Sequence, residues 1–256
     1  MDYFLPKLCN CGQQKGQPCK EKGLKNHHNF SPFGYLPDEN EIDTNYLRAT
    51  KIGVYVPFRH WALIGDITNV CNYFIRHRVQ IQTRFGESIP LAFHLEGSCT
   101  PTYFEWKDLK VGATICILYP ERHFFMDFTE GIRQEDADTV MVFPAKLQVL
   151  TEQVDKIIDY NANRQACFCC GVKSENLKRC SKCQEAYYCS KDCQIVHWKK
   201  THTKLCPHME TLSQLAKFDF SHFTGSIDWS FVRPATHSSY LHNETLYDLA
   251  QRSWWT

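Results

Sequence analysis

The chain has 256 residues, of which 43% are hydrophobic, and its 29 basic and 28 acidic side chains leave a formal net charge of +1. The longest apolar runs fall well short of the roughly twenty residues that a membrane-spanning helix needs, which argues against membrane helices and a membrane partner. A net charge near zero gives the whole molecule no electrostatic attraction to nucleic acid.

The N-terminal sequence favours an intracellular protein. It has an acidic residue at position 2 and no apolar stretch of the kind that a secretory signal needs. We therefore expect the chain in the cytoplasm, the nucleus or both. Thiols stay reduced there, so cysteines at ordered spacing favour metal binding over disulfide bonds.

Residues 1–45 mix Gly, Pro, Asn, Lys and His without a helical or strand period and predict an irregular arm. Candidate ligands for a further metal ion on this arm are Cys9, Cys11, Cys19 and either His27 or His28. Cys-x-Cys spacing is a weak indication of a metal site, so we prefer free thiols here and keep the metal-binding alternative open.

Residues 46–150 predict a mostly β domain. Short runs rich in Val, Ile, Phe, Thr and Tyr are separated by turn-forming residues. Over residues 78–84, apolar and polar side chains alternate, which predicts one buried face and one cationic, solvent-facing face. Three strands, a helical bridge at residues 103–110 and two further strands would suit a small five-stranded barrel of the OB type.

The rest of the chain predicts small helical and metal-binding units, which makes the fold class α+β. We expect a linker helix within residues 151–164, a cysteine-rich unit at residues 165–206, and a helix with an aromatic-rich tail at residues 207–256. Apolar side chains recur at helical spacing after Pro207, a residue that suits a helix start. The many aromatic residues of the tail predict that it packs back on the protein or docks a partner.

Eight of the fourteen cysteines fall between residues 166 and 206. Seven of them and one histidine form four ligand pairs, which are Cys167/Cys170, Cys180/Cys183, Cys189/Cys193 and His202/Cys206. Structural zinc takes four thiolate or imidazole ligands, so eight ligands predict two complete sites. The spacing alone leaves open whether neighbouring pairs or alternate pairs share an ion.

This pattern, with the stretch YYCSKDCQ and Trp198 between the ligands, resembles the MYND zinc finger. The resemblance covers residues 167–206 and implies two structural Zn²⁺ ions held by alternating ligand pairs. It assigns Cys167, Cys170, Cys189 and Cys193 to the first ion, and Cys180, Cys183, His202 and Cys206 to the second. With four protein ligands, neither ion would keep a free coordination position for catalysis. The remainder of the chain is assigned to no characterised family.

Two further residues of this segment, His197 and Cys169, could also bind a metal ion. Three residues separate Trp198 from His202, where the MYND pattern has two, so His197 is a rival ligand. Cys193 precedes His197 by four residues but belongs to a set already complete with thiolates, which favours His202. Cys169 is left over, and we expect it to be a spare thiol.

The cysteine-rich segment is locally basic, because residues 167–206 contain eight Lys or Arg and three Asp or Glu, a balance of +5. Seven thiolates add −7 and two Zn²⁺ ions add +4, which brings the loaded unit to about +2. We interpret the basic side chains as a solvated face that offsets the anionic clusters, in preference to a nucleic-acid patch.

The predicted function rests on the residues that lie between the metal ligands. Ser190 and Asp192 predict a helix start, and Gln194 and Trp198 then lie four residues apart on one helix face. The MYND resemblance implies that Ser181, Gln194 and Trp198 line a shallow groove for proline-rich peptides of the Pro-x-Leu-x-Pro kind. In the competing interpretation, Trp198 packs inside the finger and Gln194 is merely solvated.

These observations predict a non-enzymatic adaptor that binds proline-rich segments of partner proteins within a regulatory complex. The alternative is a nucleic-acid-binding regulator that acts through the β domain, with the finger recruiting a partner. The basic and aromatic residues behind this alternative are Arg76, Arg78, Arg84, His77, Phe74 and Phe85. We find no SET methyltransferase signature and no pattern of acid, base and nucleophile, so we expect no enzymatic activity.

Overall fold

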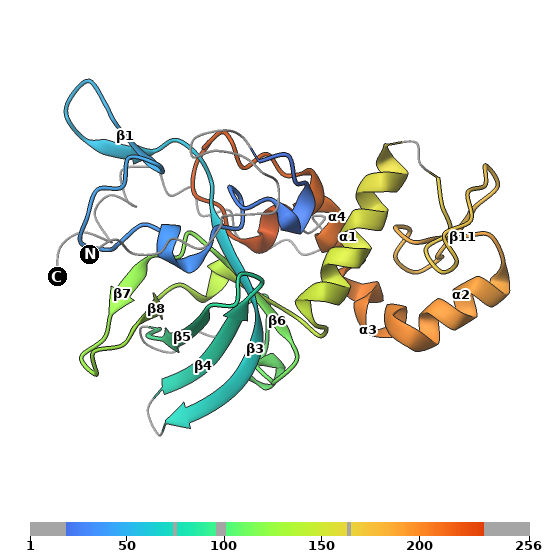
Figure 1. Ribbon diagram of the computed structural model, residues 1–256, viewed down its shortest axis with the longest axis horizontal. Coiled ribbons are helices and arrows are strands. Elements are labelled where there is room, and N and C mark those ends of the chain that lie inside the picture. The colour runs from blue at the N-terminus through green and yellow to red at the C-terminus, as the bar shows by residue number, and fades with distance from the viewer. Residues whose placement is uncertain (1–18, 74–75, 96–100, 163–164, 233–256) are drawn as a thin grey trace.

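The computed structural model describes residues 19–73, 76–95, 101–162 and 165–232 (Figure 1). Its main sheet has seven strands in the order β7-β8-β5-β4-β3-β6-β9. The strands are Ala62–Tyr73 (β3), Arg76–Thr83 (β4), Ser88–Phe93 (β5), Thr114–Leu118 (β6), Arg122–Phe124 (β7), Glu130–Gln134 (β8) and Val140–Phe143 (β9). Neighbouring strands are antiparallel except for β5 and β8, which are parallel.

β8 and β9 act as one barrel strand with a short break in its middle, and this strand closes the sheet into a barrel. β8 pairs with β5 and β9 pairs with β6, yet only residues 135–139 separate β8 from β9 along the chain, and Ala137–Thr139 form a 3-10 turn there. A meander of β3, β4 and β5, a fourth strand beside the first, and a fifth strand parallel to the third make a five-stranded barrel of the OB type. This connectivity confirms the predicted OB-like domain.

The expected helical bridge at residues 103–110 is much shorter than predicted. It consists of one 3-10 turn, Trp106–Asp108, and the chain on both sides of this turn is held by the buried side chains of Phe104 and Leu109. These two buried side chains fix the position of the chain before and after the turn, so a longer helix is not required there.

Inward-facing residues of the barrel strands fill its interior. In β4, Val79, Ile81 and Thr83 are buried and Gln82 is exposed, as the alternation over residues 78–84 predicts. The other strand residues of this core include Leu63, Ile67, Ile89, Leu91, Phe93, Ile115, Ile117, Ile132, Val140 and Val142.

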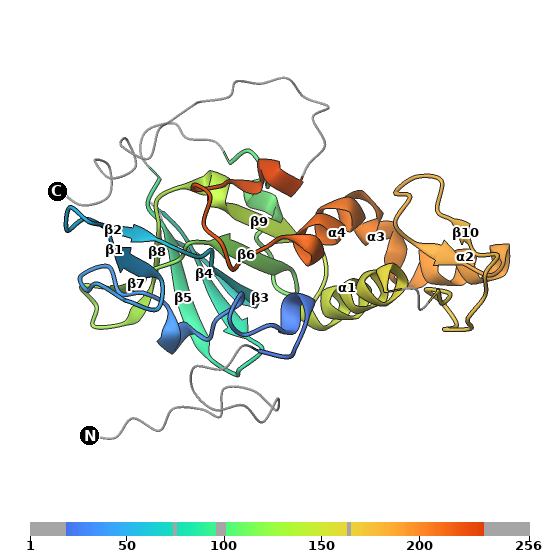
Figure 2. The same ribbon diagram turned by 90° about the horizontal axis from the view of Figure 1, so that it is seen from above.

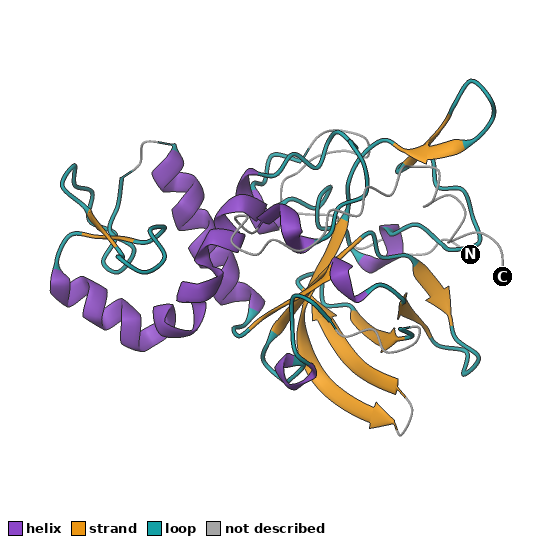
Figure 3. Ribbon diagram, turned by 180° about the vertical axis from the view of Figure 1, so that it is seen from behind, coloured by secondary structure: helices purple, strands orange, loops and turns teal. Residues whose placement is uncertain are grey.

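Two helices lie side by side against the outside of the barrel, between it and the cysteine-rich unit (Figure 2). They are α1 (Leu147–Asn161) and α4 (Met209–Lys217). Figure 3 shows the helices gathered in the middle of the molecule, with the barrel strands on one side and the small finger strands on the other. α1 begins before the predicted linker of residues 151–164, because the side chain of Asp66 in β3 binds the N–H group of Leu147.

One hydrophobic core runs through these helices from the barrel into the cysteine-rich unit. It contains Phe143 of the barrel, Leu150 of α1 and Leu212 of α4, and it continues through Phe168 and Tyr188. The cysteine-rich unit is therefore a packed extension of the barrel and not a bead on a flexible linker.

The described part of the predicted N-terminal arm packs on the barrel. Leu24, Phe30 and Leu36 are buried, and the backbone that carries them is irregular, as predicted for residues 1–45. After it, β1 (Leu47–Ala49) and β2 (Tyr55–Pro57) form a separate two-stranded sheet.

The candidate third metal site on this arm lies only partly within the structure. Cys9 and Cys11 fall outside the described residues. Cys19 is half-buried, and no group of three or more metal-ligating side chains in the described part of the chain includes Cys19, His27 or His28.

The C-terminal segment folds back along the barrel after α4. Phe220 and Trp229 are buried, as the aromatic content of the tail predicts. The tail residues Tyr240, Tyr247, Trp254 and Trp255 lie outside the described residues. Among the helices that the structure describes, none has the length and apolar character to cross a membrane.

Candidate metal centres and the adjoining helix face

The two Cys-x2-Cys turns have the same build. Gly171 donates its backbone N–H to the carbonyl of Cys167 over 2.9 Å, and Gln184 donates to the carbonyl of Cys180 over 2.9 Å. Both donors have a left-handed backbone, with φ of 75° at Gly171 and 60° at Gln184. This conformation turns the chain sharply after the second cysteine of each pair, so that both thiols of a pair face the same side.

Two regular elements bring the remaining ligands to these turns. β10 (Lys178–Arg179) pairs with β11 (Tyr187–Tyr188), which leads the chain to Cys189. α2 (Lys191–His197) then begins at Ser190, whose Oγ accepts a hydrogen bond of 3.2 Å from the N–H of Cys193. The predicted helix cap is thereby confirmed, and it places Cys193 in the first turn of α2.

The eight predicted ligands form two clusters, and in each cluster the ligand atoms all lie within 4.8 Å of one another. The first cluster is Cys167, Cys170, Cys189 and Cys193, and the second is Cys180, Cys183, His202 and Cys206. Alternate pairs share a cluster, as the MYND resemblance implies. All-thiolate and three-thiolate-plus-imidazole sets are the donor sets of structural zinc, so the clusters fit two Zn²⁺ ions.

The electrostatics of the clusters also call for a cation. Sulfur contacts with Cys193 and Cys170 raise the pKa of Cys189 to about 12, and burial together with the neighbouring Cys183 raises the pKa of Cys206 to about 12. Several thiols packed this closely resist joint ionisation, whereas a bound Zn²⁺ stabilises all of them as thiolates. Burial lowers the pKa of His202, which keeps its imidazole in the neutral, metal-binding form.

A π-turn resolves the question of which histidine is the ligand. Trp198–His202 form a π-helical turn in which the N–H of Thr203 donates to the carbonyl of Trp198, five residues earlier. This wider turn absorbs the extra residue and carries His202 to the second cluster. The rival ligand His197 is buried, and its Nδ1 lies 2.9 Å from the hydroxyl of Tyr188. Cys169 lies in neither cluster.

Two of the three predicted groove residues, Trp198 and Ser181, adjoin ligands of the second cluster. Trp198 is half-buried, and its ring meets the ligand His202 edge-on with centroids 5.7 Å apart. Gln194 is half-buried one turn earlier on the same face, and Ser181 is exposed directly after the ligand Cys180. Trp198 packs in part against the core and keeps part of its surface accessible, so a role in peptide binding stays a prediction.

Sequence reasoning missed three exposed residues on this helix face. Lys191, Ile195 and Lys199 are all exposed, and they follow the same helical spacing as Gln194 and Trp198. The signal was the heptad-like spacing from residue 191 to residue 199, which is visible once the helix start at Ser190 is accepted.

The arginines proposed for nucleic-acid binding do not form one cationic face. Arg78 pairs with Asp127 at 3.1 Å, and Arg76 forms hydrogen bonds with His94. Arg84 lies at the other end of β4, over the ring of Phe85. Of the other two ring-bearing residues, His77 stacks on Trp106 with centroids 4.1 Å apart, and Phe74 lies outside the described residues.

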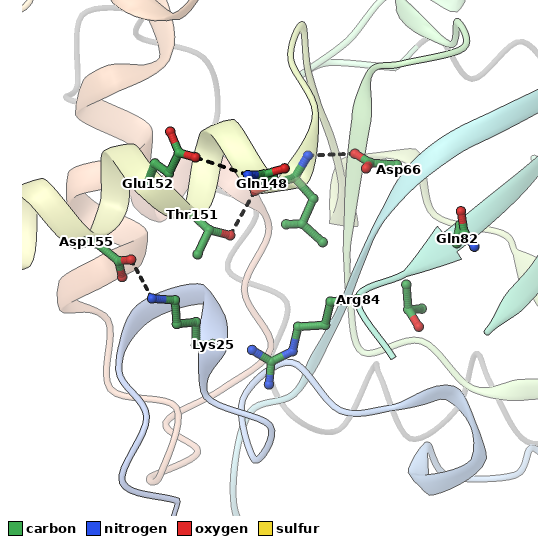
Figure 4. Close-up of a pocket in the computed structure, with 10 residues that line it drawn as sticks. Lys25, Asp66, Gln82, Arg84, Gln148, Thr151, Glu152 and Asp155 are labelled. Carbon is green, nitrogen blue, oxygen red and sulfur yellow. Dashed lines mark hydrogen bonds and ion pairs between the residues drawn. The ribbon is translucent and has the colours of Figure 1, made fainter. Parts of the chain in front are cut away.

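A polar cavity of about 500 Å³ lies between the barrel, α1 and the N-terminal segment (Figure 4). Its charged lining residues are largely paired, since Lys25 binds Asp155 at 2.6 Å and Asp66 binds the N–H of Leu147 at 2.6 Å.

Residues 167–206 match the profile of the MYND finger family. With the two ligand clusters in place, this segment is a MYND zinc finger, and the remainder of the chain is unassigned.

Three curated proteins show similarity to parts of the chain. They are N-lysine methyltransferase SMYD2-A of Danio rerio (38% identity over 61 residues), Egl nine homolog 1 of Homo sapiens (48% over 48) and Ubiquitin carboxyl-terminal hydrolase 17 of Arabidopsis thaliana (25% over 115). The alignments cover 24%, 19% and 43% of this chain but only 12%, 11% and 16% of those proteins. The chain thus spans a small part of each relative's length.

Solved structures with some likeness include a Replication Protein A heterotrimer bound to ssDNA (6% identity, TM-score 0.23) and the S. pombe Stn1-ten1 complex (12%, TM-score 0.26). The first match covers 35% of this chain and 68% of the other, and the second covers 48% and 83%. These TM-scores are too low to carry an argument, so the OB-like assignment rests on the strand connectivity.

Proposed function

We propose that this protein is a non-enzymatic adaptor of the cytoplasm or nucleus, whose MYND finger binds short proline-rich segments of partner proteins. MYND fingers are typically protein-interaction modules. The observation that supports the proline-rich specificity is the half-buried Trp198, which shares a helix face with Gln194 next to the second zinc cluster.

The chemistry of this face suits an extended, proline-rich ligand. The flat indole of Trp198 offers a stacking surface for proline rings, and the amide of Gln194 can bond the free backbone groups of a peptide that has no internal hydrogen bonds. A polyproline II segment is already stiff, so little conformational entropy is lost when it binds.

The metal centres support a structural and not a catalytic role for zinc. Each cluster supplies four ligand side chains, which leaves no coordination position for water or substrate. The shared core that joins the finger to the barrel would hold the binding face in a fixed orientation and reduce the entropy cost of binding.

The test is the affinity of the full chain for a fluorescently labelled Pro-x-Leu-x-Pro peptide. We expect Trp198→Ala to weaken binding about 30-fold or more, the loss typical of a central aromatic contact, while zinc content stays at two ions per chain. The matched control is Val196→Ala, because Val196 is exposed on another side of α2 and should not affect binding. Unchanged affinity of Trp198→Ala would refute the assignment.

One observation favours a second candidate function, the binding of single-stranded nucleic acid by the barrel. The turn between β7 and β8 exposes Phe124, Met126 and Phe128, and Arg78 of β4 holds this turn through Asp127. Exposed aromatic rings beside an arginine resemble a base-stacking platform, and this turn lies in the loop between the fourth and fifth barrel strands, which OB barrels use for oligonucleotides.

The nucleic-acid candidate has less support because Arg78 is neutralised by its ion pair. Its test is the fluorescence anisotropy of a labelled thymidine 20-mer at low salt, with the double variant Phe124→Ala/Phe128→Ala as comparison. Binding that the double variant loses would favour this function, and absence of binding by the unmodified chain would exclude it.

A further inference from the structure

We propose that the peptide-binding face of the finger selects proline-rich segments that are flanked by acidic residues. This inference rests on the proposed function, since it names the class of peptide that the same site would prefer. Its basis is the charge of the residues that surround Gln194 and Trp198.

The finger carries eight cationic side chains that are all exposed, and none of them forms an ion pair with any residue in the described part of the chain. They are Lys173, Lys178, Arg179, Lys182, Lys191, Lys199, Lys200 and Lys204. On the barrel, by contrast, Arg78, Arg122 and Arg133 pair with carboxylates. The two zinc clusters offset only part of the positive charge of the finger.

Two of these lysines lie at the ends of the proposed binding face. At 100° per residue, Lys191, Gln194 and Ile195 point to one side of α2, and Trp198 and Lys199 continue the chain in the π-turn that follows. Ile195 is 40% exposed and adds an apolar contact beside the indole of Trp198. The face therefore has an apolar and aromatic centre with an ammonium group at each end.

The dimensions of this face predict the spacing of acidic residues in the ligand. Lys191 begins α2 and Lys199 lies in the π-turn that continues it, eight residues later, which at α-helical pitch is a rise of roughly 12 Å. A polyproline II peptide advances about 3.1 Å per residue, so about four residues span the same distance. Acidic residues placed directly before and directly after a Pro-x-Leu-x-Pro core are six residues apart, roughly 19 Å, so each carboxylate would lie about 3 Å beyond the backbone position of a lysine, a gap that the long lysine side chain spans.

A third cation lies outside α2, in the turn between Cys180 and Cys183. Lys182 directly follows the predicted groove residue Ser181, and both are exposed. Basic side chains on α2 and in this turn would disfavour peptides with basic flanks, so the same charges that attract acidic segments would exclude basic ones.

The test uses three synthetic peptides with the same Pro-x-Leu-x-Pro core, flanked by Glu, by Gln or by Lys. We expect affinities in the order Glu, Gln, Lys, with the Glu-flanked peptide bound about 5- to 20-fold more tightly than the Gln-flanked one, the sum of two exposed ion pairs. Raising NaCl from 50 to 300 mM should remove most of this difference and leave the Gln-flanked affinity nearly unchanged.

The variant Lys191→Gln/Lys199→Gln should abolish the preference for Glu flanks without weakening the Gln-flanked peptide. The matched control is Lys173→Gln/Lys178→Gln, which removes two exposed lysines outside α2 and should keep the preference.

Equal affinity of the Glu- and Gln-flanked peptides would overturn this inference while the proposed function stands. Failure of all three peptides to bind would overturn both, and displacement of a bound peptide by a thymidine 20-mer would reassign the basic face to nucleic acid.

Discussion

The carboxylate of Asp66, in the middle of β3, accepts a hydrogen bond of 2.6 Å from the backbone N–H of Leu147, the first residue of α1 (Figure 4). The same oxygen accepts a hydrogen bond of 2.9 Å from the hydroxyl of Thr114. Lys146, at the cap position of α1, provides no side-chain cap of its own. A barrel residue therefore caps the helix on which the finger packs, and this bond couples the two halves of the molecule.

We expect Asp66→Ala to lower the free energy of unfolding by about 1–3 kcal/mol, since it removes a helix cap and leaves the hydroxyl of Thr114 with one partner fewer. Urea unfolding followed by circular dichroism measures this loss. Asp66→Asn keeps an acceptor oxygen and should cost clearly less. Equal losses in the two variants would mean that the carboxylate acts in some other way.

Close packing at Gly131 yields a second prediction. A Cβ atom at this position would lie 2.3 Å from the carbonyl oxygen of Pro90, within the parallel contact between β8 and β5. Gly131→Ala should therefore push the two strands apart and cost about 2 kcal/mol or more of stability. Gly34 has open space around its Cα, so Gly34→Ala is the control and should change stability by less than about 1 kcal/mol in thermal unfolding.

Removal of zinc should affect the barrel as well as the finger, because the hydrophobic core of the finger continues to the outer face of the barrel. Each structural ion contributes on the order of 10 kcal/mol to the folding of its unit. We expect Cys180→Ser to reduce the bound zinc to one ion or fewer per chain and to lower the melting temperature of the whole protein. Metal analysis and calorimetry measure both effects. Cys169→Ser should leave both unchanged, and a loss of zinc in that variant would make Cys169 a ligand.

The buried His60 should make stability depend on pH. Its Nδ1 lies 2.6 Å from the hydroxyl of Tyr119, and burial lowers the pKa of this histidine, although a backbone hydrogen bond with His222 and the nearby Asp219 act in the opposite direction. The unfolded chain then binds a proton more readily than the folded one. Stability is therefore complete above the unfolded pKa of about 6.5 and falls as the pH drops toward the lower folded pKa, by at most about 1.4 kcal/mol per pH unit.

This prediction is measured as the difference in unfolding free energy between pH 7.5 and 5.5 for the unmodified chain and for His60→Gln. The variant should show the smaller difference, because it has no proton to take up at this position. The other titrating groups are common to both proteins and cancel in the comparison. A steeper pH dependence in the variant would contradict a lowered pKa at His60.

Most of the structural features that the sequence predicted depend on local patterns of residues. The eight zinc ligands, the helix start at Ser190 and the alternation in β4 were all readable from the sequence, because each depends on residues only a few positions apart. The burial of Leu24, Phe30 and Leu36 was not readable for the opposite reason. They belong to no stretch with a helical or alternating apolar pattern, and only contacts with elements far along the chain bury them.

By itself the sequence determined the ligand set and the family of the finger, since metal coordination selects cysteines and histidines at short, fixed spacings. Only the tertiary structure decided that β8 and β9 close the barrel, that a π-turn absorbs the extra residue before His202, and that the core of the finger continues to the outer face of the barrel. These features depend on hydrogen bonds and packing between residues far apart in the chain, which no local spacing records.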